Sequence, residues 1–228
     1  MERKVPFVEN EYYHLFSRGV EQRDIFHDDQ DRERFLALLL CCNSTKNVKI
    51  SNLSKRQRGE PLLGLLDKHD AADRIISVLA YALMPNHFHI VVRENSNGAI
   101  SKFMLKLMTA YSMYFNTKYG RSGPLFTRPF RSRHVDSDEY FRWVFAYVTL
   151  NPLELHQTDW KRAGVKDLEA AQRFMKRYRY SSFSDYFFEE RPEKKILDTS
   201  AVPFSASEFQ TMDSLLCSLA EQDVSAAV

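Results

Sequence analysis

Residues 75–92 read I-I-S-V-L-A-Y-A-L-M-P-N-H-F-H-I-V-V, and this stretch decides the fold class. Ile75–Leu83 carries no charged residue and is rich in aliphatic and β-branched side chains, Phe88–Val92 is similar, and M-P-N lies between them as a turn. The pattern predicts a β-hairpin whose second strand begins at His87. Because side chains alternate faces along a strand, His87 and His89 share one face and Phe88 points to the other, into the core.

Two imidazoles side by side on one strand are suited to binding a metal ion. The histidine pair does not by itself establish a metal site, because such pairs are more often exposed or hydrogen-bonded to other groups. A metal site at His87 and His89 therefore requires a third ligand from elsewhere in the chain.

The composition indicates a globular protein. The chain has 228 residues, of which 44% are hydrophobic and 13% aromatic, enough for one full core with appendages. The N-terminal residues lack the apolar segment of a signal peptide, and no apolar run is long enough to span a membrane. Three cysteines, two of them adjacent at Cys41 and Cys42, form no disulfide framework. We therefore expect a cytoplasmic protein without membrane contact.

The charge is unevenly distributed. The net charge is +2, but residues 196–228 hold five acids and no Lys or Arg, so residues 1–195 carry +7. Arg121–His134 contains four arginines and no acid, and Arg173–Tyr180 interleaves four basic residues with three aromatics. Cations suit phosphates and aromatic faces suit unstacked bases, which favours single-stranded or looped nucleic acid. The alternative is a solvated basic face whose aromatic rings belong to the core.

The pattern along the chain predicts one α+β domain over residues 1–195, with a mainly antiparallel sheet covered by helices. Residues 196–228 form an acidic tail, for which we expect a short amphipathic helix. Residues 43–73 show little periodicity and are expected to form an insertion or a mobile loop. The other expected elements are a strand over 11–18, a helix over 28–42 and a helix carrying the apolar stripe from Ile100 to Phe115.

A further helix is predicted from about Ser137 to Leu150. Asp136 followed by Glu139 resembles a capping box, and Pro152 opposes helix beyond Asn151. Few residues of this helix are polar, so it is expected to be buried on most sides. Tyr147 and Asn151 are four residues apart and therefore share a face at its C-terminal end. On pattern alone, Tyr147 is interpreted as a core tyrosine.

Several motifs together resemble one known family. They are S-R-G-V-E-Q-R-D-I-F, M-P-N-H-F-H-I-V-V, Y-F-N-T-K-Y-G, R-S-G-P-L-F-T-R-P-F-R-S-R-H-V, A-Y-V-T-L-N-P and Y-R-Y-S-S-F-S-D-Y. In this order, over residues 11–187, they look like the IS200-like Y1 transposases, the single-tyrosine members of the HUH nucleases. The likeness is greatest to the REP-associated tyrosine transposases.

The resemblance implies a ferredoxin-like or RRM-like fold and a metal-dependent transposase that cuts and rejoins single-stranded, hairpin-bearing DNA. It makes Tyr147 the nucleophile, which forms a 5′-phosphotyrosine. It makes His87 and His89 ligands of Mg²⁺ or Mn²⁺, with Asn151 as the third. Compact family members carry Gln at this last position, so the shorter Asn departs from their pattern. The candidate DNA-binding residues are Arg18, Arg128, Arg131, Arg133, Lys176, Arg177 and Arg179.

Two alternatives stay open at this point. The chain could be a catalytically silent binder of structured DNA or RNA with the same fold. It could also be a metal-dependent hydrolase in which water attacks and Tyr147 is structural. The sequence also leaves open whether the chain forms a homodimer.

Overall fold

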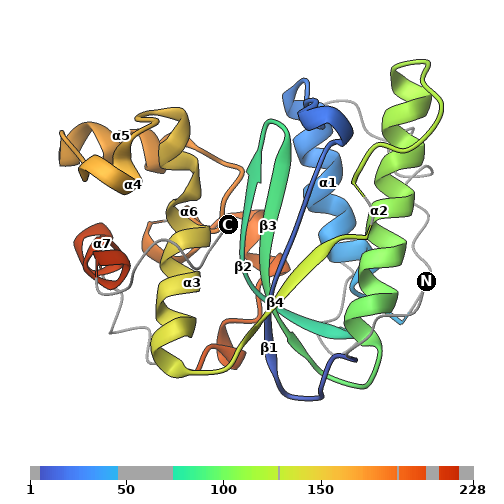
Figure 1. The fold of residues 1–228 in the computed structure, drawn as a ribbon, viewed down its shortest axis with the longest axis horizontal. Coiled ribbons are helices and arrows are strands. Elements are labelled where there is room, and N and C mark those ends of the chain that lie inside the picture. Colours follow the sequence, from blue (N-terminus) through green and yellow to red (C-terminus); the bar gives the residue numbers. More distant parts are fainter. Residues whose placement is uncertain (1–5, 46–73, 128, 189, 204–210, 221–228) are drawn as a thin grey trace.

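The computed structural model describes residues 6–45, 74–127, 129–188, 190–203 and 211–220. A four-stranded antiparallel sheet in the order β2-β3-β1-β4 lies at its centre (Figure 1). The strands are β1 (Tyr12–Arg18), β2 (Ile76–Met84), β3 (His87–Glu94) and β4 (Arg131–Val135). The helices are α1 (Asp29–Cys42), α2 (Ala99–Lys118), α3 (Asp138–Leu150), α4 (Trp160–Ala163), α5 (Leu168–Arg177), α6 (Phe183–Phe187) and α7 (Met212–Ala220). Short 3-10 turns are η1 (Val20–Gln22), η5 (Asn151–Leu155), η6 (Pro192–Ile196) and η7 (Thr199–Ala201).

The chain order β1-α1-β2-β3-α2-β4, together with this strand order, is the ferredoxin-like arrangement. The predicted α+β class with an antiparallel sheet is therefore confirmed. The predicted hairpin is also present, since β2 and β3 are joined by Pro85 and Asn86 and pair from Met84 opposite His87 onward. Phe88 is fully buried on the opposite face from the two histidines, as the alternation requires.

Helices cover both faces of the sheet (Figure 1). On one face α1 and α2 pack against Phe88, Ile90 and Val92 of β3. On the other face α3 packs against Val91 and against Leu79, Ala80 and Ala82 of β2, with α7 on its outer side. A bulge between Val78 and Ala80 shifts the β2 register and places both Leu79 and Ala80 on the α3 face. His87 and His89 lie on this α3 face.

The start of α3 differs from the sequence prediction by one residue. Ser137, in extended conformation, is the N-cap, and its hydroxyl oxygen accepts a hydrogen bond from the Tyr140 amide at 3.1 Å. The predicted capping role of Asp136 is therefore wrong, because the adjacent serine makes the capping contact. At the other end α3 stops at Leu150, and the chain continues as the 3-10 turn η5, with Pro152 near its start. This turn keeps Asn151 directly below Tyr147.

Other segments relate only in part to the predictions. The sequence did not predict β4, which lies in a segment interpreted only as basic. Residues 46–73, most of the expected insertion over 43–73, lie outside the described part of the chain. Asn43 ends α1, and its amide bonds to Ile75 and Ile76 at the start of β2, so the chain leaves and returns at one place. Among the described helices, none has the length and hydropathy needed to cross a membrane.

Candidate active site

The two histidines of β3 stand next to each other with their rings perpendicular. Their centroids are 5.0 Å apart with an interplanar angle of 89°, and His89 is buried while His87 is half-buried. Asn86 orients His87. Its Nδ2 donates to the Gln22 carbonyl at 3.2 Å, which turns its Oδ1 toward Nδ1 of His87 at 2.6 Å. Because that oxygen accepts, Nδ1 carries the proton and Nε2 of His87 keeps a free lone pair.

A third histidine, His14 of β1, supports His89 from behind. Nε2 of His14 lies 2.8 Å from Nδ1 of His89, and the His14 side chain is buried. With Nδ1 of His89 engaged in this way, Nε2 of His89 is the nitrogen left for another partner. Sequence reasoning missed His14, because its position beside His89 depends on the register of β1 against β3, in which Phe16 lies opposite His89.

Burial keeps these imidazoles neutral at pH 7. Desolvation, with the nearby Arg133 charge, lowers the pKa of His14 to about 3. Desolvation lowers the pKa of His87 to about 4, and the charges of Arg18 and Lys161 act in the same direction against Glu154. The pKa of His89 is lowered well below its usual range by burial and by its histidine neighbours. A neutral imidazole is the form that binds metal ions.

Tyr147 projects from α3 onto the histidine pair. Its ring meets His89 edge-on, with centroids 5.5 Å apart, and lies stacked on Trp143 at 5.1 Å. The Nζ atom of Lys161 lies 4.7 Å from the centre of the same ring. The side chain is largely buried. Tertiary packing therefore brings together Tyr147 and the two histidines, which are far apart in the sequence.

Asn151 is fully buried beside His87. Its amide raises the pKa of His87, opposing the larger effect of desolvation. Apart from this interaction with His87, neither Oδ1 nor Nδ2 has a hydrogen-bond partner among the residues that the structure describes. A buried amide whose hydrogen bonds are incompletely satisfied costs about 1–3 kcal/mol, so such a group is rare in the absence of a ligand.

The residues at this place fit a divalent metal ion. No group of three His, Cys, Asp or Glu side chains within the described ranges is placed to hold one. The available donors are instead the Nε2 atoms of His87 and His89 and the buried Oδ1 of Asn151. Two imidazoles and one neutral oxygen are a suitable set for Mn²⁺, and less well matched to Mg²⁺, which prefers oxygen ligands.

A charged pair flanks the site, and sequence reasoning also missed it. Lys161 Nζ and Glu154 Oε2 are 2.9 Å apart, and both charges act on His87. Glu154 lies in the turn η5 and Lys161 in the short helix α4. No pattern in the sequence predicts this contact, because η5 and the loop after it fold the chain back toward the β3 histidines.

Three of the predicted DNA-binding arginines share the face of the sheet that carries the histidines. In the strand register Arg18 lies opposite His87, and Arg131 and Arg133 of β4 lie opposite Phe16 and His14. Alternation along the strands places these arginines on the α3 side. Arg18 and Arg131 are exposed, and Arg133 is half-buried. Arg128 lies outside the described residues.

The other predicted basic residues lie elsewhere, near the C-terminal end of α5. Arg179 pairs with Glu193 at 3.1 Å and with Glu33 at 3.8 Å. Lys176 lies over the ring of Phe188, and Arg177 is exposed. The structure therefore places them near α6 and η6, and it engages Arg179 in ion pairs within the chain.

Comparison with known proteins connects this geometry to a family. Residues 67–151 match the family described as "Transposase IS200 like", a segment that contains His87, His89, Tyr147 and Asn151. A solved structure of a REP-associated tyrosine transposase bound to a REP hairpin is similar at 12% identity and a TM-score of 0.46, covering 81% of this chain and 84% of that one. A search of curated proteins gives no match. The resemblance seen in the sequence is thus confirmed at the level of the IS200-like family.

Proposed function

We propose that this chain, whose residues 67–151 match the IS200-like transposase family, cuts and rejoins single-stranded DNA, with Tyr147 as nucleophile. One observation carries the proposal. The Tyr147 ring packs edge-on against His89 at the same place where the fully buried amide of Asn151 faces His87 with no other hydrogen-bond partner among the described residues. A purely structural tyrosine explains neither the buried amide at this place nor the pair of neutral histidines beside it.

The reaction is a transesterification. The Tyr147 hydroxyl oxygen attacks the phosphorus, a new oxygen–phosphorus bond forms, and the bond to the 3′ oxygen breaks. The phenol loses its proton and the leaving 3′ oxygen gains one. The products are a 5′-phosphotyrosine and a free 3′-OH, and the reverse step rejoins strands without an energy source.

The side chains around Tyr147 prepare it for this step. Trp143 stacks on the ring and fixes its plane, and burial of the ring limits the access of water that would compete as nucleophile. Lys161 and Arg18 place positive charge near His87, where a phosphate would bind. His87, His89 and Asn151 would hold Mg²⁺ or Mn²⁺, which as a Lewis acid relieves charge on a non-bridging phosphate oxygen.

Hairpin-bearing single strands are the proposed substrate, as the sequence resemblance implies. Arg18, Arg131 and Arg133 supply cations on the face of the sheet that leads to Tyr147. Phosphates of a strand lying on this face would pass the histidine pair. A silent binder with the same fold would use the same arginines, so the distinction depends on covalent chemistry.

The decisive experiment uses labelled single-stranded hairpin oligonucleotides from the DNA flanking the gene. After incubation with Mn²⁺ or Mg²⁺, a denaturing gel should show a protein band carrying the DNA label. Tyr147→Phe should lose this band and keep DNA binding, because phenylalanine fills the same space. Tyr114→Phe is the matched control, since its hydroxyl donates to Asp31 on the other face of the sheet, and it should react normally.

Two outcomes would contradict the proposal. Binding without any adduct or cleavage supports the silent binder. Cleavage without an adduct, unchanged in Tyr147→Phe, supports a hydrolase in which water attacks.

A further inference from the structure

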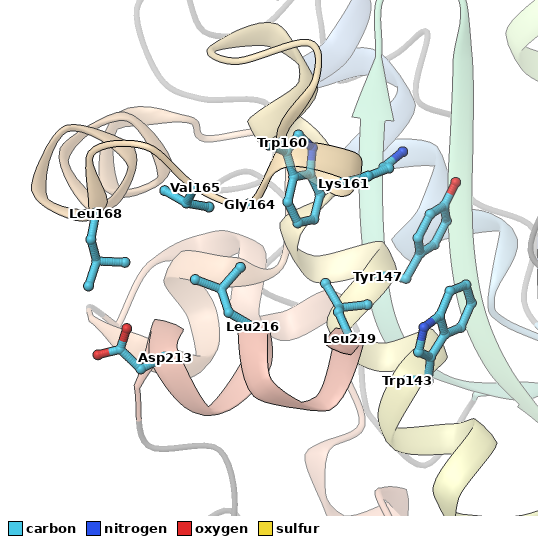
Figure 2. A pocket seen from close by; sticks show the side chains of 10 residues that line it. All are labelled: Trp143, Tyr147, Trp160, Lys161, Gly164, Val165, Leu168, Asp213, Leu216 and Leu219. Carbon is cyan, nitrogen blue, oxygen red and sulfur yellow. The ribbon is translucent and has the colours of Figure 1, made fainter. Parts of the chain in front are cut away.

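A cavity of about 330 Å³ adjoins the candidate active site on the side away from the sheet. It lies between α3, the α4–α5 segment and α7 (Figure 2). Trp143, Tyr147, Trp160 and Lys161 line one end of it, and aliphatic side chains, with Asp213, line the rest. The cavity therefore shares Tyr147 and Lys161 with the site described above.

The aromatic end of the cavity has polar groups that lack partners. Trp143 and Trp160 are 2% and 4% exposed, and neither indole nitrogen has a hydrogen-bond partner among the described residues. In Figure 2 the Trp143 nitrogen lies on the side of its ring that faces Leu219, across the cavity. An indole N–H can only donate, so the buried Trp143 donor requires an acceptor that the described part of the chain does not supply.

We propose that this cavity binds one unstacked nucleobase of the DNA strand, next to the phosphate that Tyr147 attacks. The proposal rests on the proposed function and adds to it a base-binding subsite. A base offers a flat face for stacking on the Trp160 indole, since Tyr140 and Tyr147 already stack on the Trp143 ring. Its ring nitrogens and carbonyl oxygens are acceptors for the Trp143 N–H.

The charges at the two ends of the cavity set the direction of the strand. Lys161, over the Tyr147 ring, is suited to a backbone phosphate at the mouth. The Asp213 carboxylate at the other end repels a phosphate. The sugar-phosphate backbone would therefore stay on the Tyr147 side while the base enters among the apolar side chains.

The binding of a base can be observed directly, because Trp143 and Trp160 are the chain's two tryptophans. The assay uses Tyr147→Phe protein, in which the oligonucleotide stays uncut, and measures tryptophan fluorescence during titration. The probes are the hairpin oligonucleotide and a series in which each nucleotide near the cleaved phosphate is in turn replaced by an abasic residue. Stacking should quench the fluorescence.

We expect one abasic position, adjoining the cleaved phosphate, to abolish most of the quenching and to weaken binding about tenfold, which corresponds to 1.4 kcal/mol. Trp143→Phe and Trp160→Phe assign the quenching to each ring, and circular dichroism checks their folding. Leu216→Trp should fill the cavity from α7 and weaken binding of the intact oligonucleotide while leaving the affinity of that abasic oligonucleotide unchanged.

The outcomes separate this proposal from the proposed function. An adduct on Tyr147 in the unmodified protein, combined with quenching and affinity that no abasic position changes, would overturn the base subsite and leave the nuclease intact. Quenching that depends on one base, without any adduct, would support the subsite and contradict the nuclease.

Discussion

Replacing Asn151 by leucine should stabilise the metal-free protein, although Asn151 is a proposed active-site residue. Its side chain is 0% accessible, and apart from its interaction with His87 its amide atoms have no hydrogen-bond partner among the described residues. An apolar side chain of similar size removes the cost of the incompletely paired amide, about 1–3 kcal/mol. For a chain of this size, each kcal/mol raises the melting temperature by about 2–4 °C.

Asn43 provides a matched control. Its amide is also buried, but Nδ2 donates to the Ile76 carbonyl at 2.9 Å and Oδ1 accepts from the amides of Ile75 and Ile76 at 3.1 and 3.0 Å. Asn43→Leu leaves these buried backbone groups unpaired and should destabilise the protein by about 2–5 kcal/mol. The two variants make the same chemical change, so the opposite signs isolate the effect of the partners.

The assay is thermal unfolding followed by circular dichroism in EDTA and then in Mn²⁺. In Mn²⁺ the melting temperature of the unmodified protein should rise, because a ligand that binds the folded state stabilises it. Asn151→Leu should show a smaller rise. If Asn151→Leu lowers the melting temperature in EDTA as much as Asn43→Leu does, the Asn151 amide has partners in the folded protein and the reasoning fails.

The remaining predictions concern the histidines, the acid limb of stability and the arginines. His87→Ala and His89→Ala should each remove most metal-dependent cleavage, with Mn²⁺ at least as effective as Mg²⁺ in the unmodified protein; full activity in EDTA would exclude a metal-assisted reaction. Burial lowers the pKa of His14 to about 3, so below pH 6.5 the unfolded state binds more protons than the folded state. The contribution of His14 to the free energy of unfolding should therefore be complete above pH 6.5 and fall progressively toward pH 3. His14→Gln should flatten this fall in denaturant titrations, and an unchanged pH dependence would place its origin in another group. Arg131→Ala with Arg133→Ala should reduce the salt dependence of single-strand binding, by roughly 0.7 in the log–log slope for each phosphate that these side chains neutralise; an unchanged slope would contradict phosphate binding by these arginines.

The correctly predicted elements are those whose signals are local. The β2–β3 hairpin follows from two apolar segments and a Pro-Asn turn, and α1 begins where Asp28 accepts a hydrogen bond from the Asp31 amide. Sequence reasoning missed β4 because Arg131–Val135 alternates charged and polar residues with a single buried valine. Such a composition is typical of an edge strand, where charges oppose pairing with other chains, and it is hard to distinguish from a loop.

The contacts of the active site divide in the same way: some follow from the periodicity of one strand or helix, and others depend on tertiary packing. His87 and His89 share a face by strand periodicity, and Tyr147 and Asn151 by helical periodicity, so each pair could be found in the sequence. The groups that orient these pairs and place charge beside them could not be found in the sequence. His14 reaches His89 through the β1–β3 register, and Glu154 and Lys161 come back to His87 because η5 reverses the chain after α3. These contacts depend on how strands and helices pack, and that is where a structure adds most to a motif.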